Sequence, residues 1–127
     1  MSYFEKHFTL EEAQALLPAV RDAFSKIDAI RESLAKHGKD IESLMKASDG
    51  NGGGKGSADY LDDILALNSI MSELTREGIL IKDLGQGLVD FPCMRDGREV
   101  FLCWRVGEDT ISYWHELETG FAGRQAL

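Results

Sequence analysis

The chain has 127 residues, of which 43% are hydrophobic and 28% are charged, and this length is enough for one domain with its own hydrophobic core. A formal net charge of -8 argues against nucleic acid as a partner, because binding phosphates requires clustered Lys and Arg. The chain has only two cysteines, no apolar signal segment and no apolar run long enough to cross a membrane, so we expect a cytoplasmic protein with reduced thiols that binds no membrane.

Apolar side chains follow the spacing of an amphipathic helix from Thr9 onward. Thr9 and Glu12 match a capping box, in which each side chain bonds to the backbone N–H of the other residue. Pro18 lies inside the apolar pattern, where we expect a kink but no break, because the pattern keeps its phase across it. The predicted stripe comprises Leu10, Ala13, Leu17, Val20, Phe24 and Ile27, and continues past Gly38.

A glycine-rich stretch separates this helix from a second one. Residues 49–57 are predicted to form a flexible loop, because so many glycines disfavour both helix and strand. The second helix is expected from about Ala58 to Glu77, and Gly78 is a typical residue to follow a helix end. Two long helices joined by one loop predict an antiparallel helical hairpin over about residues 9–77.

From Ile79 the apolar pattern alternates with a period of two, which is typical of strands. Asp96-Gly97 lies between two alternating runs and predicts a tight hairpin, and residues 107–110 supply a second turn. If both turns are two-residue loops, Asp90 faces Cys103 and Cys103 faces Trp114. A three-residue loop at Gly107 would instead shift the second pairing by one residue. The predicted fold of residues 1–127 is a single α+β domain: a long antiparallel helical hairpin packed against a small three- to four-stranded antiparallel β-meander.

With two-residue loops, the predicted strands have one apolar face and one mixed face. The inner, helix-facing side comprises Val89, Phe91, Cys93, Val100, Leu102, Trp104, Val106, Ile111, Tyr113 and His115. The outer side comprises Leu88, Asp90, Pro92, Phe101, Cys103, Arg105, Ser112, Trp114 and Glu116. An outer face that mixes aromatic, acidic and basic residues predicts a binding or interface surface.

The chain resembles a bacterial family catalogued as domain of unknown function 2203. The resemblance covers essentially the whole chain except the glycine-rich loop, and it implies a small helical-plus-β protein without any assignable activity. It is carried by residues 8–18, 81–84, 87–92, 103–108, 113–116 and 120–124.

The candidate ligand or interface residues are Asp90, Phe101, Cys103, Arg105, Trp114, Glu116 and Arg124. An ion pair between Asp90 and Arg105 is expected. Cys103 is interpreted as a buried small hydrophobe, because the predicted faces place no histidine beside it. No metal site and no cofactor are expected: His115 and Glu116 are neighbours in a strand and point to opposite faces, which leaves His115 as a core histidine. The catalytic residues, if any exist, are unknown.

These features predict an uncharacterised, non-enzymatic protein that self-associates or binds a small ligand, with a homodimer as the default assembly. The apolar patch on the outer face favours this hypothesis, because such patches usually mark partner sites. The alternative is a small enzyme that uses Asp90, Arg105, Glu116 and Cys103 in a cleft on the same face. The ligand and the reaction stay open at this point.

Overall fold

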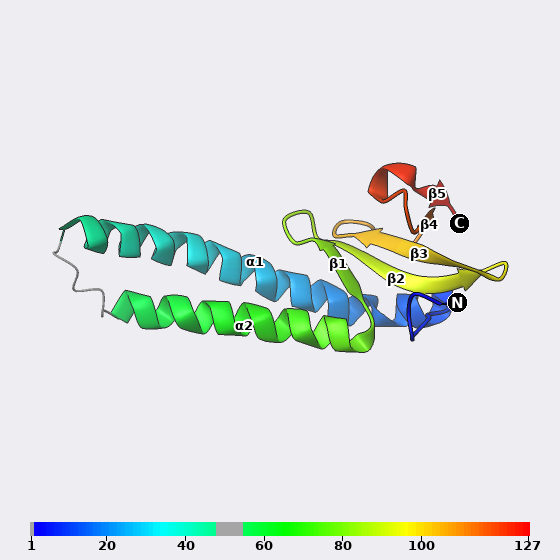
Figure 1. Ribbon diagram of the computed structural model, residues 1–127. Helices are drawn as coiled ribbons and strands as arrows, with labels where there is room; N and C mark the ends of the chain where they lie inside the picture. The colour runs from blue at the N-terminus through cyan, green and yellow to red at the C-terminus, as the bar shows by residue number, and fades with distance from the viewer. Residues whose placement is uncertain (1, 48–54) are drawn as a thin grey trace. The chain divides into compact units, whose positions relative to one another are not determined.

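The computed structural model describes the backbone of residues 2–47 and 55–127, and the side chains of residues 2–38 and 58–127. Its elements, in chain order, are α1 (Leu10–Ala47), α2 (Lys55–Glu77), β1 (Leu80–Asp83), β2 (Leu88–Arg95), β3 (Arg98–Arg105), β4 (Tyr113–Glu116), the short 3-10 helix η1 (Phe121–Gly123) and β5 (Gln125–Ala126) (Figure 1). The α+β fold is therefore confirmed, with five strands in place of three or four. The part of the predicted loop at residues 49–54 lies outside the described residues, and α2 begins three residues earlier than expected.

The described chain divides into two compact units, Met1–Asp22 with Glu73–Leu127, and Ala23–Ser72. The described residues of the second unit belong to α1 and α2. The first, called here the sheet unit, contains the five strands, the start of α1 and the end of α2. None of the helices in the described ranges is long and apolar enough to span a membrane.

Local signals in the sequence explain where the helices begin and end. The Thr9 backbone N–H donates to the Glu12 carboxylate at 2.9 Å, and the Glu12 N–H donates to the Thr9 hydroxyl at 3.1 Å, which confirms the capping box. Helix α1 continues through Pro18 without a break. Helix α2 ends at Glu77 and is followed by Gly78, whose positive φ of 94° allows the N–H groups of Gly78 and Ile79 to bond back to Thr75 and Leu74.

The sheet is antiparallel with the strand order β1-β2-β3-β4-β5. Asp96 and Gly97 both have positive φ angles, of 53° and 76°, as a two-residue type I′ turn requires. The register of the first hairpin is as predicted, because Asp90 pairs with Cys103.

The predicted register of the second hairpin is wrong by one residue. Cys103 pairs with Tyr113 instead of Trp114, and Phe101 pairs with His115. This register corresponds to an odd-numbered turn centred on Glu108, whose carboxylate accepts the Arg105 backbone N–H at 2.7 Å. Because successive residues in a strand alternate faces, this shift moves every side chain of β4 to the opposite face from the one predicted.

The inner face of the sheet packs against the first turns of α1, within the sheet unit (Figure 1). Phe8 and Phe91 meet edge to face with ring centroids 5.4 Å apart. The Gln14 side chain bonds to both backbone polar groups of Ile111, and fully buried Trp104 lies on this face. The buried apolar residues of the sheet unit include Phe8, Ala13, Leu17, Val20, Ile79, Val89, Phe91, Val100, Leu102, Trp104 and Ile111.

The chain's own ends cover part of the outer face. In Figure 1, η1 lies on the side of the sheet opposite the start of α1. The Phe4 ring packs on Phe101 with centroids 5.3 Å apart, and the Arg124 side chain reaches the Cys103 carbonyl. The predicted exposed apolar patch is therefore wrong: Phe101 is 3% exposed, Leu88 and Pro92 are also buried, and buried Trp114 belongs to the opposite face.

Candidate functional site

Asp90, His115 and Cys103 form a buried cluster on the outer sheet face, called here the Asp–His–Cys cluster. Asp90 comes from β2, Cys103 from its neighbour β3, and His115 from β4. Asp90 is 1% exposed, Cys103 is 0% exposed and His115 is 2% exposed. One potential ligand atom from each lies within 4.8 Å of the others. The register of β4 creates this cluster, because a shift by one residue would turn His115 to the inner face.

The hydrogen bonds of His115 determine the protons that the cluster holds. Its Nδ1 lies 2.7 Å from the Glu116 carbonyl oxygen, which can only accept, so Nδ1 carries a proton. Its Nε2 lies 3.1 Å from both carboxylate oxygens of Asp90. A second proton must therefore lie between Nε2 and Asp90, either on the ring as an imidazolium or on the carboxyl group. In both states the pair has no net charge.

Burial controls the ionisation of the other two groups. It raises the pKa of Asp90 above the usual carboxyl value, while the nearby His115 acts in the opposite direction. Burial, together with the adjacent Asp90 carboxylate, raises the pKa of Cys103 to about 12. At neutral pH Cys103 is therefore a thiol and a poor nucleophile.

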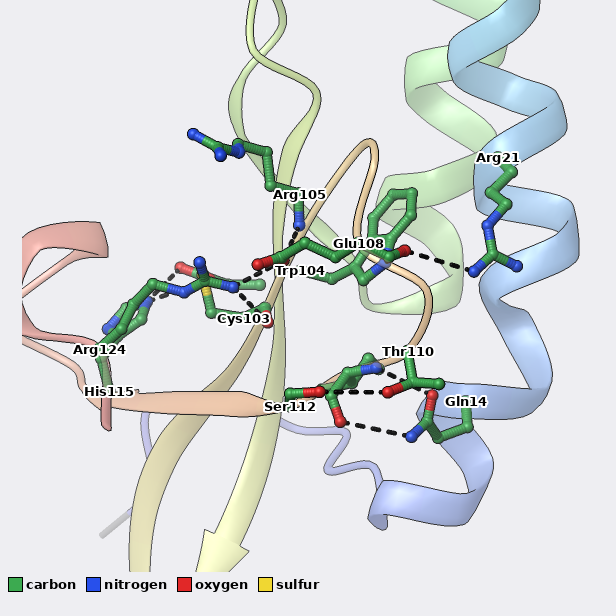
Figure 2. Close-up of polar contacts among 12 residues, drawn as sticks. Gln14, Arg21, Cys103, Trp104, Arg105, Glu108, Thr110, Ser112, His115 and Arg124 are labelled. Atoms are coloured by element: carbon green, nitrogen blue, oxygen red, sulfur yellow. Dashed lines mark hydrogen bonds and ion pairs between the residues drawn. The ribbon is translucent and has the colours of Figure 1, made fainter. Parts of the chain in front are cut away.

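A second polar group, the Arg124–Glu108 ion pair, borders the cluster. An Arg124 nitrogen lies 2.6 Å from the Glu108 carboxylate and 3.4 Å from the Cys103 carbonyl oxygen. Figure 2 shows one guanidinium nitrogen of Arg124 directed toward both acceptors. Burial of the Glu108 carboxylate acts to raise its pKa. Its bonds to Arg124 and to the Arg105 N–H have a larger effect in the opposite direction, so the pKa of Glu108 is lowered.

Aromatic rings frame the Arg124 guanidinium. It lies over the Tyr113 ring at 4.1 Å and over the Phe121 ring at 4.6 Å from each centroid. The exposed Arg105 guanidinium lies 5.2 Å from the Phe121 centroid. These contacts fix the C-terminal segment beside the Asp–His–Cys cluster.

The structure brings together only some of the predicted site residues. Asp90, Phe101, Cys103 and Arg124 lie on the outer face as expected, with Phe101 next to the His115 ring. Trp114 lies on the inner face, because of the register of β4, with the Arg95 guanidinium 4.6 Å from its ring. The predicted Asp90–Arg105 ion pair is absent among the described contacts, and Asp90 pairs with His115 instead.

Glu116 also lies apart from the cluster. Its carboxylate pairs with Arg98 at 2.8 Å and borders an open cavity of about 630 Å³. The cavity is lined by Ser2, Tyr3, Met94, Gly97, Arg98, Glu99, Glu116, Leu117, Glu118 and Thr119. Two of its three acidic lining residues, Glu99 and Glu116, already have partners.

The sequence interpretation missed His115, Glu108 and Tyr113 as outer-face residues. The only signal that could have revealed them was the length of the turn at Gly107, since a three-residue turn places all of β4 on the observed faces. With that register, the segments that carried the family resemblance supply Asp90, Cys103, Glu108, His115 and Arg124 to one face.

The comparison with known families agrees with this resemblance. Residues 6–127 match the model of a family described as an uncharacterized conserved protein (DUF2203). The chain belongs to the DUF2203 family. The description of DUF2203 assigns it no activity. No curated protein and no solved structure matched this DUF2203 chain significantly.

Proposed function

We propose that this DUF2203 protein is a non-enzymatic binding protein whose small ligand occupies the Asp–His–Cys cluster. The observation that carries the proposal is the meeting of three different donor side chains, from three strands, within 4.8 Å in a buried place. Placing Asp90 and His115 there costs desolvation free energy that an apolar pair would avoid, and such a cost is common at functional sites. The burial limits the ligand to an ion or a molecule of a few atoms.

The same geometry disfavours the enzyme alternative. A thiol nucleophile requires a lowered pKa, whereas the pKa of Cys103 is raised. The cleft of Asp90, Arg105, Glu116 and Cys103 would have needed all four side chains on one face, and Glu116 pairs with Arg98 away from the others. The proposal includes a cytoplasmic location, because a free thiol persists best in a reducing compartment.

Native mass spectrometry of the purified full chain tests the proposal. We expect a species retained under native conditions and released by denaturation, and we expect its loss in His115→Gln. The matched control is His37→Gln, because His37 pairs with Asp63 in the other unit. A wild-type mass equal to that of the bare chain, under conditions where the control protein is folded, would refute the proposal.

Self-association is a second candidate function, supported by a different surface from the one predicted. Leu61 and Leu65 lie one turn apart on α2 and are 55% and 57% exposed. Two large apolar side chains at this spacing favour packing against a second helix, and a two-fold homodimer is the commonest assembly. Sedimentation should show a dimer that the double substitution Leu61→Glu with Leu65→Glu converts to a folded monomer, and a monomeric wild type would exclude this candidate.

A further inference from the structure

We infer that the ligand of the Asp–His–Cys cluster is a single divalent transition-metal ion of the zinc class, bound by an Asp90 carboxylate oxygen, the Cys103 sulfur and His115 Nε2. This inference rests on the proposed function and identifies the chemical class of its ligand. Imidazole, thiolate and carboxylate are the three side-chain donors that Zn²⁺ uses most. A thiolate with an imidazole also disfavours Mg²⁺ and Ca²⁺, which prefer oxygen donors.

The spacing of the donor atoms is close to that of a coordinated ion. Tetrahedral Zn²⁺ with bonds of about 2.0–2.3 Å separates its donor atoms by about 3.3–3.6 Å. The Nε2 of His115 lies 3.1 Å from the Asp90 oxygens, and all three donors lie within 4.8 Å of one another. Separations of up to 4.8 Å exceed the tetrahedral spacing by about 1 Å, so binding requires small shifts of the donor side chains.

The hydrogen bond at the far side of the His115 ring is the second, independent observation. Metal-binding histidines almost always donate their other ring N–H to a carbonyl or carboxylate, which fixes the ring and the tautomer. His115 Nδ1 donates to the Glu116 backbone carbonyl at 2.7 Å. This bond leaves Nε2 as the nitrogen that faces Asp90 and Cys103. Because this carbonyl belongs to the backbone, no substitution of the Glu116 side chain removes the hydrogen bond.

The balance of charge also suits a divalent ion. One divalent cation meets one carboxylate, one thiolate and one neutral imidazole, so the buried cluster has no net charge when the ion is bound. Nearby Lys82 and Arg124 add positive charge, but Arg124 is paired with Glu108. The fourth coordination position is then available to a water molecule or a small anion.

Titration of the metal-free full chain with Co²⁺, and separately with Zn²⁺, tests the inference. Co²⁺ bound to a cysteine gives a thiolate-to-cobalt charge-transfer absorption that aspartate and histidine sites lack. We expect this absorption to saturate at one Co²⁺ per chain and to disappear when Zn²⁺ displaces the cobalt.

Matched variants locate the ion. Cys103→Ser should abolish the charge-transfer absorption, whereas Cys93→Ser should keep it, because Cys93 is the other free cysteine and lies on the opposite face. Asp90→Asn and His115→Gln should each weaken Zn²⁺ binding by about 100-fold or more, since even the loss of a partner outside the ligand set costs 10–100-fold. Circular dichroism shows which variants are folded. If Asp90→Asn and His115→Gln unfold, Cys103→Ser still tests the inference, because it is the smallest change of the three.

Three results would overturn the inference. These are no metal binding by the folded wild type, binding unchanged in Cys103→Ser, and binding lost in Cys93→Ser alone. If native mass spectrometry instead finds a retained organic molecule or anion that His115→Gln loses, the metal inference fails while the proposed function stands. If neither a metal nor another species is retained, both fail.

Discussion

His115 Nε2 lies 3.1 Å from each carboxylate oxygen of Asp90, although β3 separates the strands that carry the two residues. The side chains meet above β3 on the outer face, where both are 2% exposed or less. The contact between the two groups therefore offsets the free energy that each loses when it is removed from water. A pair of this kind couples β2 to β4 across the central strand β3.

Asp90→Ala should destabilise the metal-free protein by about 3–5 kcal/mol, because it leaves the buried imidazole without its partner. His115→Ala should cost a similar free energy of unfolding for the same reason. The double substitution should cost clearly less than the sum, since it removes both polar groups. Urea denaturation of the wild type, the two single variants and the double variant measures these free energies of unfolding. If the effects of the single substitutions simply add, the two residues are not coupled.

Trp104→Ala and Trp114→Ala should both destabilise the protein by about 3–5 kcal/mol, as is usual for buried aromatic residues. With Trp114 only 7% exposed and Trp104 fully buried, both changes leave cavities in the sheet unit. Met94→Ala is the control on β2, because Met94 is 45% exposed and its loss should change stability by about 0.5 kcal/mol or less. A Trp114→Ala protein as stable as the Met94→Ala control would contradict the observed burial of Trp114.

The contrast between the two hairpins shows what could be predicted from the sequence. Asp96-Gly97 specifies its own turn, so the pairing of Asp90 with Cys103 followed from local residues. The turn around Glu108 also depends on a residue far along the chain, because Arg124 binds the Glu108 carboxylate. Local patterns cannot reveal such contacts, and an error of one residue was enough to remove His115 from the predicted site.

Gly123→Ala should loosen the C-terminal segment, because a methyl group at this position would overlap the Thr119 side chain. We expect a loss of about 1–3 kcal/mol, as for other overpacked sites, measured by thermal unfolding. Thr119→Gly should rescue the variant by removing the overlapping atoms. Gly38→Ala is the matched control: no atom lies within 4 Å of the added methyl group, and the change should stabilise α1 by about 1 kcal/mol.

The last prediction concerns the attachment of the N-terminal segment to Glu99. The Glu99 carboxylate accepts the backbone N–H groups of Tyr3 and Phe4 at 2.7 and 3.1 Å, and lies 2.8 Å from Nε2 of His7. These bonds, first the one from Tyr3 and then the one from His7, lower the pKa of Glu99. A carboxyl group whose pKa is lower in the folded state than in the unfolded state stabilises the folded state at pH values above its unfolded pKa of about 4.3. This stabilisation is lost as the pH falls toward the lower pKa of the folded state.

We therefore expect the Tyr3 and Phe4 amide protons to exchange slowly at neutral pH and to lose protection as the pH falls below about 4.3, after correction for intrinsic exchange rates. Glu99→Gln should expose these amides already at neutral pH and remove their acid response. Glu12→Gln is the control, because Glu12 also has a lowered pKa but serves the start of α1. Protection of Tyr3 and Phe4 that responds to acid equally in wild type and Glu99→Gln would show that another group holds the segment. Because Phe4 packs on Phe101, and Phe101 on His115, detachment of the segment is also expected to speed the entry of ligands to the Asp–His–Cys cluster.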